Sequence, residues 1–271
     1  MPPLINRSRR AGFFSTMNRK VSIIIISHNL KSYLERCIKT IEDNTERDLL
    51  EEIIVVDNGS APEYQLKELI TVTALPLSLL RLATNTSFSK ANNSGVAIAK
   101  GRFICFMNND IEVIDGWLSS LYKIIDTDPR VGAVGPKMIF PDGSIQFAGY
   151  EMDPATNFQR HRFRTDKVSH LIPEANHPGP ASSLTGACLL VRSEDAHFDE
   201  RYWYGCEDVD LCLQLKQKRE IIYYQPQAVV IHHEEKSRLS GIVSIDFEKN
   251  RKLFRAKWGK QWRALLWEIV T

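Results

Sequence analysis

The sequence lacks the runs and motifs that identify several common protein classes. Its 271 residues contain no apolar stretch long enough to cross a membrane. The basic segment 1–20 has no long apolar core, so it does not have the pattern of a secretion signal. The five cysteines are scattered, odd in number and form no C-x-x-C pair, which argues against a zinc ribbon and a disulfide framework. We therefore expect a reducing, cytoplasmic setting.

Two phosphate-binding motifs are also missing. No G-x-G-x-x-G follows the first predicted strand, where ISHNL stands instead, and the sequence has no P-loop. These absences argue against a dinucleotide dehydrogenase and a P-loop NTPase. The formal net charge of +2 gives no indication of a nucleic-acid partner. A composition of 43% hydrophobic and 25% charged residues is typical of a soluble globular protein, with either one large α/β domain or two small ones.

Predicted strands and helices alternate through the first part of the chain. β-branched and apolar runs predict strands, and apolar residues at helical spacing predict the helices between them. The alternation predicts a parallel sheet with right-handed crossovers. The strands are VSIIII (21–26), EEIIVVD (51–57), LSLLRLA (77–83) and RFICFMN (102–108), and the helices cover 31–44, about 63–72, and 87–101, the last capped by Ser87 or Ser89 and ended by Gly101.

The alternation breaks after a helix near residues 115–126. Later segments predict strands of an antiparallel part, and the polar stretch 151–181 predicts a long loop that is functional or disordered. The predicted strands are VGAVGPKMIFPDG, SIQFAGY, GACLLVR, IIYYQ and AVVIHH, with helices over EDVDLCLQLKQK (207–218) and 243–270.

Polar side chains follow four of the predicted parallel strands. In open α/β sheets, ligands bind at the carboxyl ends of the strands, so these positions predict a nucleotide-sized site along one edge. They are Ser27 and Asn29, Asp57, Asn85, and Asn109 with Asp110.

Each of these residues, taken alone, also has a purely structural explanation. Asp57 begins a D-N-G-S sequence that suits a turn, and Asp110 could cap a helix. Asn92 and Asn93 could form a solvated helix face. Two acids that open a helix, such as Glu207 and Asp208, interact favourably with its dipole without any catalytic role. One residue of the pair His232 and His233 is expected to be structural.

Seven short motifs follow one another along the chain: VSIIIISHN, IIVVDNGS, NTSFSKANNSG, ICFMNNDIEV, LTGACLLVR, CEDVDLC and VVIHHEEKS. Taken in this order, they resemble the glycosyltransferases of family 2, in particular the bacterial rhamnosyltransferase-like branch. The resemblance covers roughly residues 20–240, and it implies an inverting enzyme with the nucleotide-diphospho-sugar transferase fold, GT-A. This fold is α/β, with a mainly parallel central sheet flanked by helices and a smaller antiparallel part.

The resemblance implies a divalent cation, Mg²⁺ or Mn²⁺, at the diphosphate of the donor. The family places Asp-x-Asp at this site, whereas this chain has Asn108-Asn109-Asp110 and so lacks the first carboxylate. Asp110 matches the remaining ligand position. His232 matches the family's histidine better than His233 does, because Ser237 follows it at the familiar offset. Oxygen ligands together with phosphate suit such a hard cation.

The resemblance also assigns catalytic and donor-binding roles. Asp208 matches the base that takes the proton of the acceptor hydroxyl, Glu207 would orient the acceptor or the base, and Asp210 would be structural. Asp57 matches the acid that contacts the uracil or ribose. The other expected donor-binding residues are Ser27, Asn29, Asn85, Asn92, Asn109 and Asp110, with Thr185 and Gly186 beside the sugar.

The expected partners are a nucleotide-diphospho-sugar donor and a saccharide or lipid-linked acceptor, in cell-surface polysaccharide synthesis and without nucleic acid. Two alternatives remain: a sugar-1-phosphate nucleotidylyltransferase, which SHNLKSY does not favour, and a degenerate nucleotide-sugar-binding domain without turnover.

The organisation that we expect is a disordered arm over 1–19, or a start at Met17, a GT-A domain over 20–240 and a helical extension over 241–271. Tryptophans and basic residues in the extension are compatible with peripheral contact at the inner face of the membrane. They are equally compatible with packing on the domain or on a second subunit in a homo-oligomer.

Overall fold

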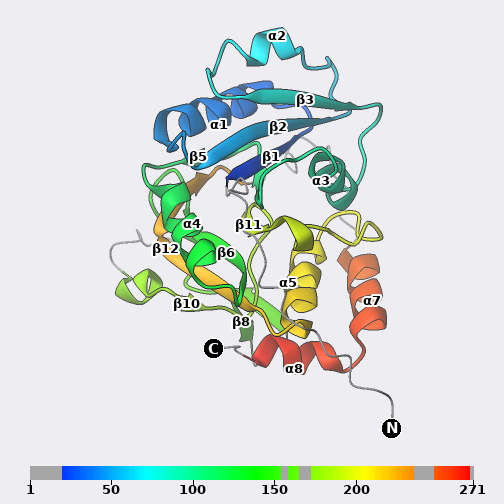
Figure 1. Ribbon diagram of the computed structural model, residues 1–271. Coiled ribbons are helices and arrows are strands. Elements are labelled where there is room, and N and C mark those ends of the chain that lie inside the picture. Colours follow the sequence, from blue (N-terminus) through cyan, green and yellow to red (C-terminus); the bar gives the residue numbers. More distant parts are fainter. Residues whose placement is uncertain (1–19, 154–157, 165–171, 235–246, 269–271) are drawn as a thin grey trace, which may run out of the picture.

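The computed structural model describes residues 20–153, 158–164, 172–234 and 247–268. Within these ranges the chain forms a ten-stranded mixed sheet and a separate two-stranded sheet, with helices packed around them (Figure 1). The predicted arm 1–19, Ser237 and part of the predicted C-terminal extension lie outside the described residues. No helix in the described ranges is long and apolar enough to span a bilayer.

The first part of the chain forms the parallel half of the sheet, as predicted. Its β-branched strands are buried, which suits strands covered on both faces. The spatial order is β4-β1-β2-β3, and the neighbouring strands of this set are parallel. The elements are β1 (Val21–Ser27), α1 (Lys31–Asn44), β2 (Leu50–Asn58), α2 (Leu66–Leu69), β3 (Leu77–Leu82), α3 (Phe88–Val96) and β4 (Phe103–Asn108).

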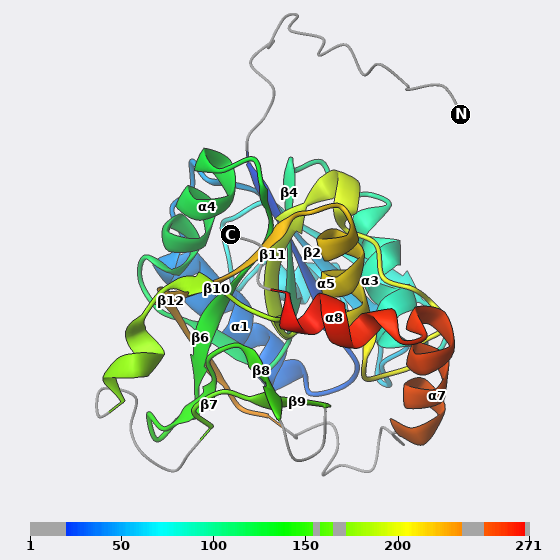
Figure 2. The same ribbon diagram turned by 90° about the horizontal axis from the view of Figure 1, so that it is seen from below.

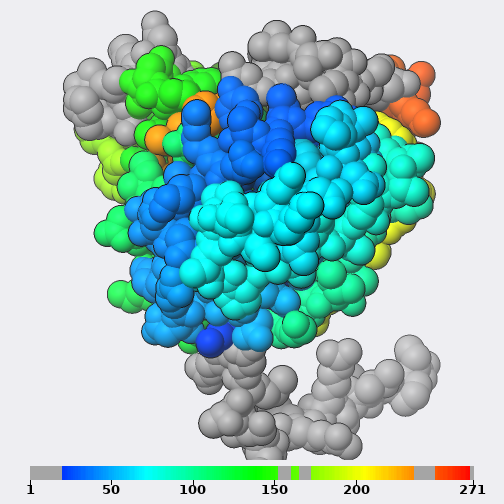
Figure 3. Space-filling view, turned by 90° about the horizontal axis from the view of Figure 1, so that it is seen from above, coloured from blue at the N-terminus to red at the C-terminus, as the bar shows by residue number. Residues whose placement is uncertain are grey.

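Two predicted helices in this half are shorter than expected. The helix near 63–72 is a short segment, Leu66–Leu69. Ser87 caps α3 by accepting a hydrogen bond from the Lys90 N–H at 3.1 Å, as predicted, but α3 ends at Val96 rather than at Gly101. The outer face beside α2, seen from above, consists mainly of residues from this N-terminal half, coloured blue and cyan (Figure 3).

The second part of the chain adds the mixed half of the sheet. Strand β11 is antiparallel to both β4 and β6, and β12 is parallel to β6 and antiparallel to the short strand β5. The elements are β5 (Ile111–Val113), α4 (Trp117–Thr127), β6 (Val131–Ile139), β7 (Ile145–Phe147), β8 (Tyr150–Asp153), β9 (Phe158–His161), η2 (Pro173–Asn176), β10 (Gly179–Pro180), β11 (Cys188–Arg192), η3 (Ser193–Asp195), α5 (Glu207–Gln217), β12 (Ile221–His232), α7 (Phe247–Trp258) and α8 (Gln261–Trp267).

Two predictions for this half need correction, and one strand was missed. The two strands predicted over IIYYQ and AVVIHH are one strand, β12, with a shift of register between Gln225 and Val229. The segment 151–181 is not a loop throughout, because β9, η2 and β10 form within it. Strand β5 was not predicted, since three residues are too few to show a periodic pattern.

The C-terminal helices pack on α5. Figure 2 shows α8 lying across α5, with α7 beside them. Trp258 and Trp262 are buried in an apolar cluster with residues of α5, whereas Trp267 is 59% exposed. The buried Lys216 of α5 donates hydrogen bonds to the carbonyl oxygens of Leu265 and Glu268, each at 3.0 Å. Two of the three tryptophans of the predicted extension therefore contribute to the packed interior.

Candidate active site

The register of the parallel strands brings the predicted polar positions to one edge of the sheet. Ser27 at the end of β1 pairs with Asp57 of β2, and Asp57 pairs with Arg81 of β3. On the other side of β1, Ile26 pairs with Asn108 of β4. The strand ends are thus level with one another, as the carboxyl edge of an open α/β sheet requires for a ligand site.

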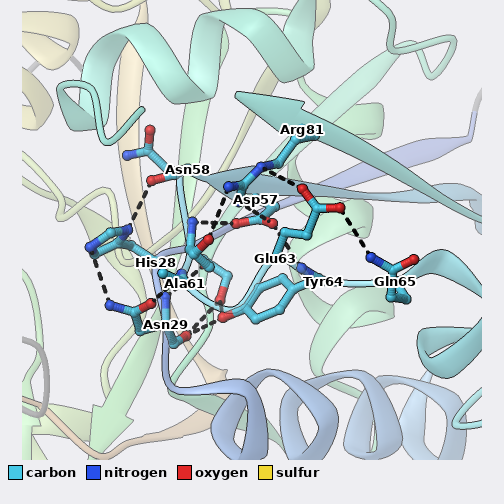
Figure 4. A network of polar contacts seen from close by, with 11 residues as sticks. His28, Asn29, Asp57, Asn58, Ala61, Glu63, Tyr64, Gln65 and Arg81 are labelled. Atoms are coloured by element: carbon cyan, nitrogen blue, oxygen red, sulfur yellow. Dashed lines mark hydrogen bonds and ion pairs between the residues drawn. The ribbon is translucent and has the colours of Figure 1, made fainter. Parts of the chain in front are cut away.

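Asp57 is fully buried at this edge, within a network of hydrogen bonds (Figure 4). Its Oδ1 accepts from the Ser60 N–H at 2.9 Å. Its Oδ2 accepts from the Tyr64 N–H at 3.1 Å and from Arg81 Nη1 at 2.6 Å. Burial raises the pKa of this carboxyl group, but the hydrogen bonds that it accepts outweigh burial and lower the pKa below its ordinary value. Asp57 therefore stays ionised and holds the turn after β2; its contact with the nucleotide stays a prediction.

The first loop of the edge is tied to the same turn. Ser27 Oγ lies 2.8 Å from Tyr64 Oη and accepts a 2.8 Å hydrogen bond from Asn109 Nδ2. Asn29 has a left-handed backbone with φ of 57°, and its N–H donates to Ser60 Oγ at 2.8 Å. Ser27, Asn29 and Asn109 thus converge with the Asp57 turn. Tyr64 was not among the predicted site residues, although it follows the D-N-G-S turn closely.

The two predicted asparagines of the donor segment lie near the ends of β2 and β3. Asn85 Oδ1 accepts from Asn58 Nδ2 at 2.9 Å. Asn92 is 1% exposed, and its Oδ1 has no hydrogen-bond partner among the described residues. The alternative of a solvated helix face is wrong, because Asn93 is buried as well. The donor-binding role of Asn92 stays a prediction.

Asp110 and His232 meet at the point where β4 gives way to β5. His232 Nε2 lies 3.3 Å from Asp110 Oδ1, and both residues are largely buried. The pairing of His232 with Ile111 of β5 brings the histidine to this place. Asp110 precedes a strand, so the alternative that it caps a helix is wrong. His233 instead places Nε2 at 2.6 Å from Glu112 Oε1.

The Asp110 and His232 pair fits a divalent cation that a diphosphate helps to hold. A carboxylate oxygen and an imidazole nitrogen, both nearly buried, face one another at 3.3 Å. The described residues include no cluster of three or more His, Cys, Asp or Glu side chains able to hold a metal ion. Mg²⁺ commonly binds through one or two protein carboxylates and completes its coordination with water and substrate phosphate.

The two adjacent acids that open α5 are Glu207, which is buried, and Asp208, which is half-buried. Burial and the charge of Asp208 raise the pKa of Glu207 to about 8. Burial also raises the pKa of Asp208, although less, because backbone N–H groups and Thr185 donate hydrogen bonds to it. Glu207 Oε2 has no partner among the described residues. The pKa values of both neighbouring carboxyl groups are therefore raised above their ordinary range.

Gly186 connects Asp208 to the end of the sheet. The Gly186 N–H donates to Asp208 Oδ2 at 3.3 Å, and the neighbouring Ala187 carbonyl accepts from the Asn108 N–H at 2.9 Å. A Cβ at position 186 would lie 3.3 Å from the ring of Phe88, so any larger residue here would crowd that ring. One hydrogen bond at Gly186 and a second at Ala187 thus link Asp208 to Asn108, the first residue of the Asn108–Asp110 segment.

Asp210 is fully buried and has the structural role that was expected. It accepts hydrogen bonds from Tyr202 Oη at 3.1 Å, Gln214 Nε2 at 2.7 Å and Trp258 Nε1 at 2.8 Å, and it pairs with Lys257 Nζ at 2.7 Å. These contacts join α7 to the helix that carries Glu207 and Asp208.

Comparison with known proteins identifies the family. Residues 22–183, more than half of the chain, match the family model "Glycosyl transferase family 2". The chain belongs to this family.

Curated relatives of this family 2 chain include the O-antigen biosynthesis protein RfbC of Myxococcus xanthus, 31% identical over 83% of the chain and 18% of RfbC. Another is the N-acetylglucosaminyl-diphospho-decaprenol L-rhamnosyltransferase of Mycobacterium tuberculosis, 27% identical over 82% of the chain and 78% of that protein. These relatives confirm the predicted rhamnosyltransferase-like branch. The chain spans only about a fifth of the length of RfbC.

Solved structures confirm the GT-A fold. The crystal structure of GalNAc-T7 with UDP, GalNAc and Mn²⁺ superposes with a TM-score of 0.72 and 17% identity, over 90% of this chain and 50% of that one. The mannosyltransferase PcManGT of Pyrobaculum calidifontis, in complex with GDP-Man and Mn²⁺, gives 0.58 and 17%, over 82% and 59%. At this identity the likeness concerns the fold.

Proposed function

We propose that this chain is an inverting, cation-assisted glycosyltransferase. It transfers a sugar from a nucleotide-diphospho-sugar to a saccharide or lipid-linked acceptor in cell-surface polysaccharide synthesis. The observation that carries the proposal is the placement of Asp208 and the Asp110–His232 pair on adjoining segments at one sheet edge. Family membership supports the same reaction class.

In the proposed reaction, the acceptor hydroxyl attacks the anomeric carbon from the side opposite the diphosphate, so the configuration inverts. Asp208 takes the hydroxyl proton as the new glycosidic bond forms. The raised pKa of the buried Glu207 disfavours a second negative charge beside this base. Asp110 and His232 would hold Mg²⁺ or Mn²⁺, which neutralises charge on the departing nucleoside diphosphate.

The relatives suggest the substrate classes. One is named for L-rhamnosyl transfer to an N-acetylglucosaminyl-diphospho-decaprenol, and another for O-antigen biosynthesis. We therefore propose a hexosyl or deoxyhexosyl donor, with rhamnose as the first sugar to test, and a polyprenyl-diphosphate-linked acceptor. Such an acceptor would bring a cytoplasmic chain to the inner face of the membrane.

The test begins with a thermal-shift screen of nucleoside diphosphates and their sugars, with and without Mn²⁺. A ligand that binds only the folded state raises the melting temperature. Stabilising donors are then incubated with a polyprenyl-diphosphate-linked N-acetylglucosamine, and NMR reads the anomeric configuration of the product. Inversion and dependence on the cation are expected; a product that retains the donor configuration would contradict the mechanism.

A nucleotide-sugar binder without turnover is the second candidate, because Asn108 stands where the family has an acid. Donor hydrolysis separates the two candidates. Slow, cation-dependent release of the free sugar from a stabilising donor indicates an enzyme, whereas binding without release indicates a binder.

A further inference from the structure

Gln146 holds the imidazole of His232 from the side opposite Asp110. It lies on β7, is 2% exposed, and contacts His232 twice through one side-chain amide. Gln146 Nε2 donates to the His232 carbonyl oxygen at 3.1 Å, and Gln146 Oε1 lies 2.6 Å from His232 Nδ1. None of the motifs considered in the sequence included this residue. The side-chain amide of Gln146 thus contacts both the backbone and the ring of the same histidine.

The two contacts together determine which nitrogen of His232 carries the proton. A carbonyl oxygen can only accept, so the NH₂ group of the amide must face the His232 backbone. The amide oxygen must then face Nδ1, and because that oxygen can only accept, Nδ1 must donate. In the neutral ring, the lone pair is therefore on Nε2, the nitrogen that faces Asp110 Oδ1 at 3.3 Å.

A lone pair that faces a carboxylate at this distance is unfavourable unless something positive lies between them. A divalent cation satisfies both atoms at once, and it needs the unprotonated Nε2 that Gln146 provides. Histidines that bind metal commonly donate their other N–H to a carbonyl or carboxylate group, which fixes the ring. His233, the neighbouring histidine, has no such arrangement toward Asp110, since its ring contacts Glu112.

We propose that Gln146 is a positioning residue that holds His232 in the Nδ1-protonated form and so presents Nε2 to the cation. This inference rests on the cation site of the proposed function. It predicts that removing the amide weakens cation binding through a change in the histidine, without removing a ligand. Truncation of such partners typically weakens metal affinity about 10–100-fold.

The first measurement is the tautomer of His232 in the apo protein. Long-range ¹H–¹⁵N NMR of histidine-labelled protein at one mildly alkaline pH distinguishes the two neutral forms, and the spectrum of His232→Ala identifies the His232 signals among the seven histidines. We expect the Nδ1–H form in the wild type and a mixture in Gln146→Leu. Predominance of the Nε2–H form in the wild type would overturn the inference even if no variant could be prepared.

The second measurement is Mn²⁺ affinity by electron paramagnetic resonance, alone and with UDP, GDP or dTDP. Gln146→Leu should weaken binding roughly 10–100-fold. Gln146→Glu should restore part of it, because a carboxylate still accepts from Nδ1–H but has no donor for the His232 carbonyl oxygen. The matched control is Gln225→Leu, a buried glutamine of β12 whose side chain contacts the Gln227 backbone, and it should leave affinity unchanged.

His232→Ala separates the two proposals. If His232→Ala weakens Mn²⁺ binding while Gln146→Leu keeps both the Nδ1–H form and full affinity, the role of Gln146 is wrong and the cation site stands. If His232→Ala leaves Mn²⁺ affinity unchanged, the cation site itself is wrong, and the inference about Gln146 fails with it.

Discussion

Gly186 donates its backbone N–H to Asp208 Oδ2 over 3.3 Å, and through this contact the loop before β11 fixes the carboxylate that we propose as the base. The Val209 N–H donates to the other oxygen at 2.7 Å. With both oxygens held, Asp208 has a defined orientation before any acceptor arrives, which a general base needs.

Asp208→Asn should lower sugar transfer by roughly two to four orders of magnitude, the usual contribution of a positioned base. Donor binding should stay nearly unchanged, and the melting temperature should fall only slightly, because the amide keeps the shape and one of the two acceptor oxygens. Transfer is measured in steady state and donor affinity by calorimetry. A variant that transfers sugar at nearly the wild-type rate would rule out Asp208, and Glu207 would be tested next.

Glu207→Gln should change how stability depends on pH. Burial and the Asp208 charge raise the pKa of Glu207 from 4.5 to about 8, so between these values the folded state holds a proton that the unfolded chain has released. The stabilising contribution of this group is full below the lower value and is lost as the pH rises to the upper one. Glutamine does not titrate.

The melting temperatures of the wild type and of Glu207→Gln are compared from about pH 5 to pH 8. The wild type should lose stability relative to the variant as the pH rises through this window. A difference that stays constant across the window would show that Glu207 titrates at its ordinary value.

Asp110→Asn should abolish cation-dependent binding of a nucleoside diphosphate and leave the fold intact. The amide is nearly isosteric but lacks the charge that a hard cation requires. Calorimetry with and without Mn²⁺ measures the effect, and circular dichroism checks the fold. Unchanged cation-dependent binding would show that Asp110 is not a ligand of the cation.

His232→Ala should weaken cation-dependent binding far more than His233→Ala does. Adjacent residues on a strand point to opposite sides, and the ring of His233 lies against Glu112 rather than Asp110. The same calorimetric titration compares the two variants. A larger loss for His233→Ala would show that His233 is the ligand, and equal losses would contradict the assignment to His232.

Asp210→Ala should destabilise the protein by about 1–3 kcal/mol, the usual cost of leaving a buried donor without its acceptor. The removed carboxylate would leave the buried Trp258 Nε1 without its acceptor, whereas Lys257 keeps its ion pair with Asp199. Urea unfolding measures the change. Arg255→Ala on the exposed side of α7 is the control and should stay within about 0.5 kcal/mol. A loss no larger than that of the control would contradict the anchoring role of Asp210.

The sequence predicted the parallel half of the fold well because its signals are local. The run VSIIII reads as a buried strand by itself, and Ser87 caps α3 through a contact three residues away. The level strand ends then follow from parallel pairing, which places Ser27 beside Asp57.

The rest depended on contacts between distant segments. The contact between Asp110 and His232 follows from the pairing of β5 with β12, and Gln146 reaches His232 from a three-residue strand. The single arginine in the apolar run LSLLRLA was a signal for a buried acid partner, and Arg81 indeed pairs with Asp57. The order of the motifs identified the candidate site residues, but only the side-chain geometry showed which of them contact one another.

The pairing of β5 with β12 also bears on the order in which the protein folds. Strands β1 to β4 close through nearby crossovers, whereas β12 must return across a long stretch of chain before its last residue reaches β5. Long-range closures of this kind are entropically costly and slow. The edge at the ends of β1, β2 and β3 can thus assemble early, while the Asp110–His232 pair forms only when the C-terminal part of the sheet is in place. Acquisition of cation affinity during refolding would then mark the last step of folding, and a bound cation would stabilise that step.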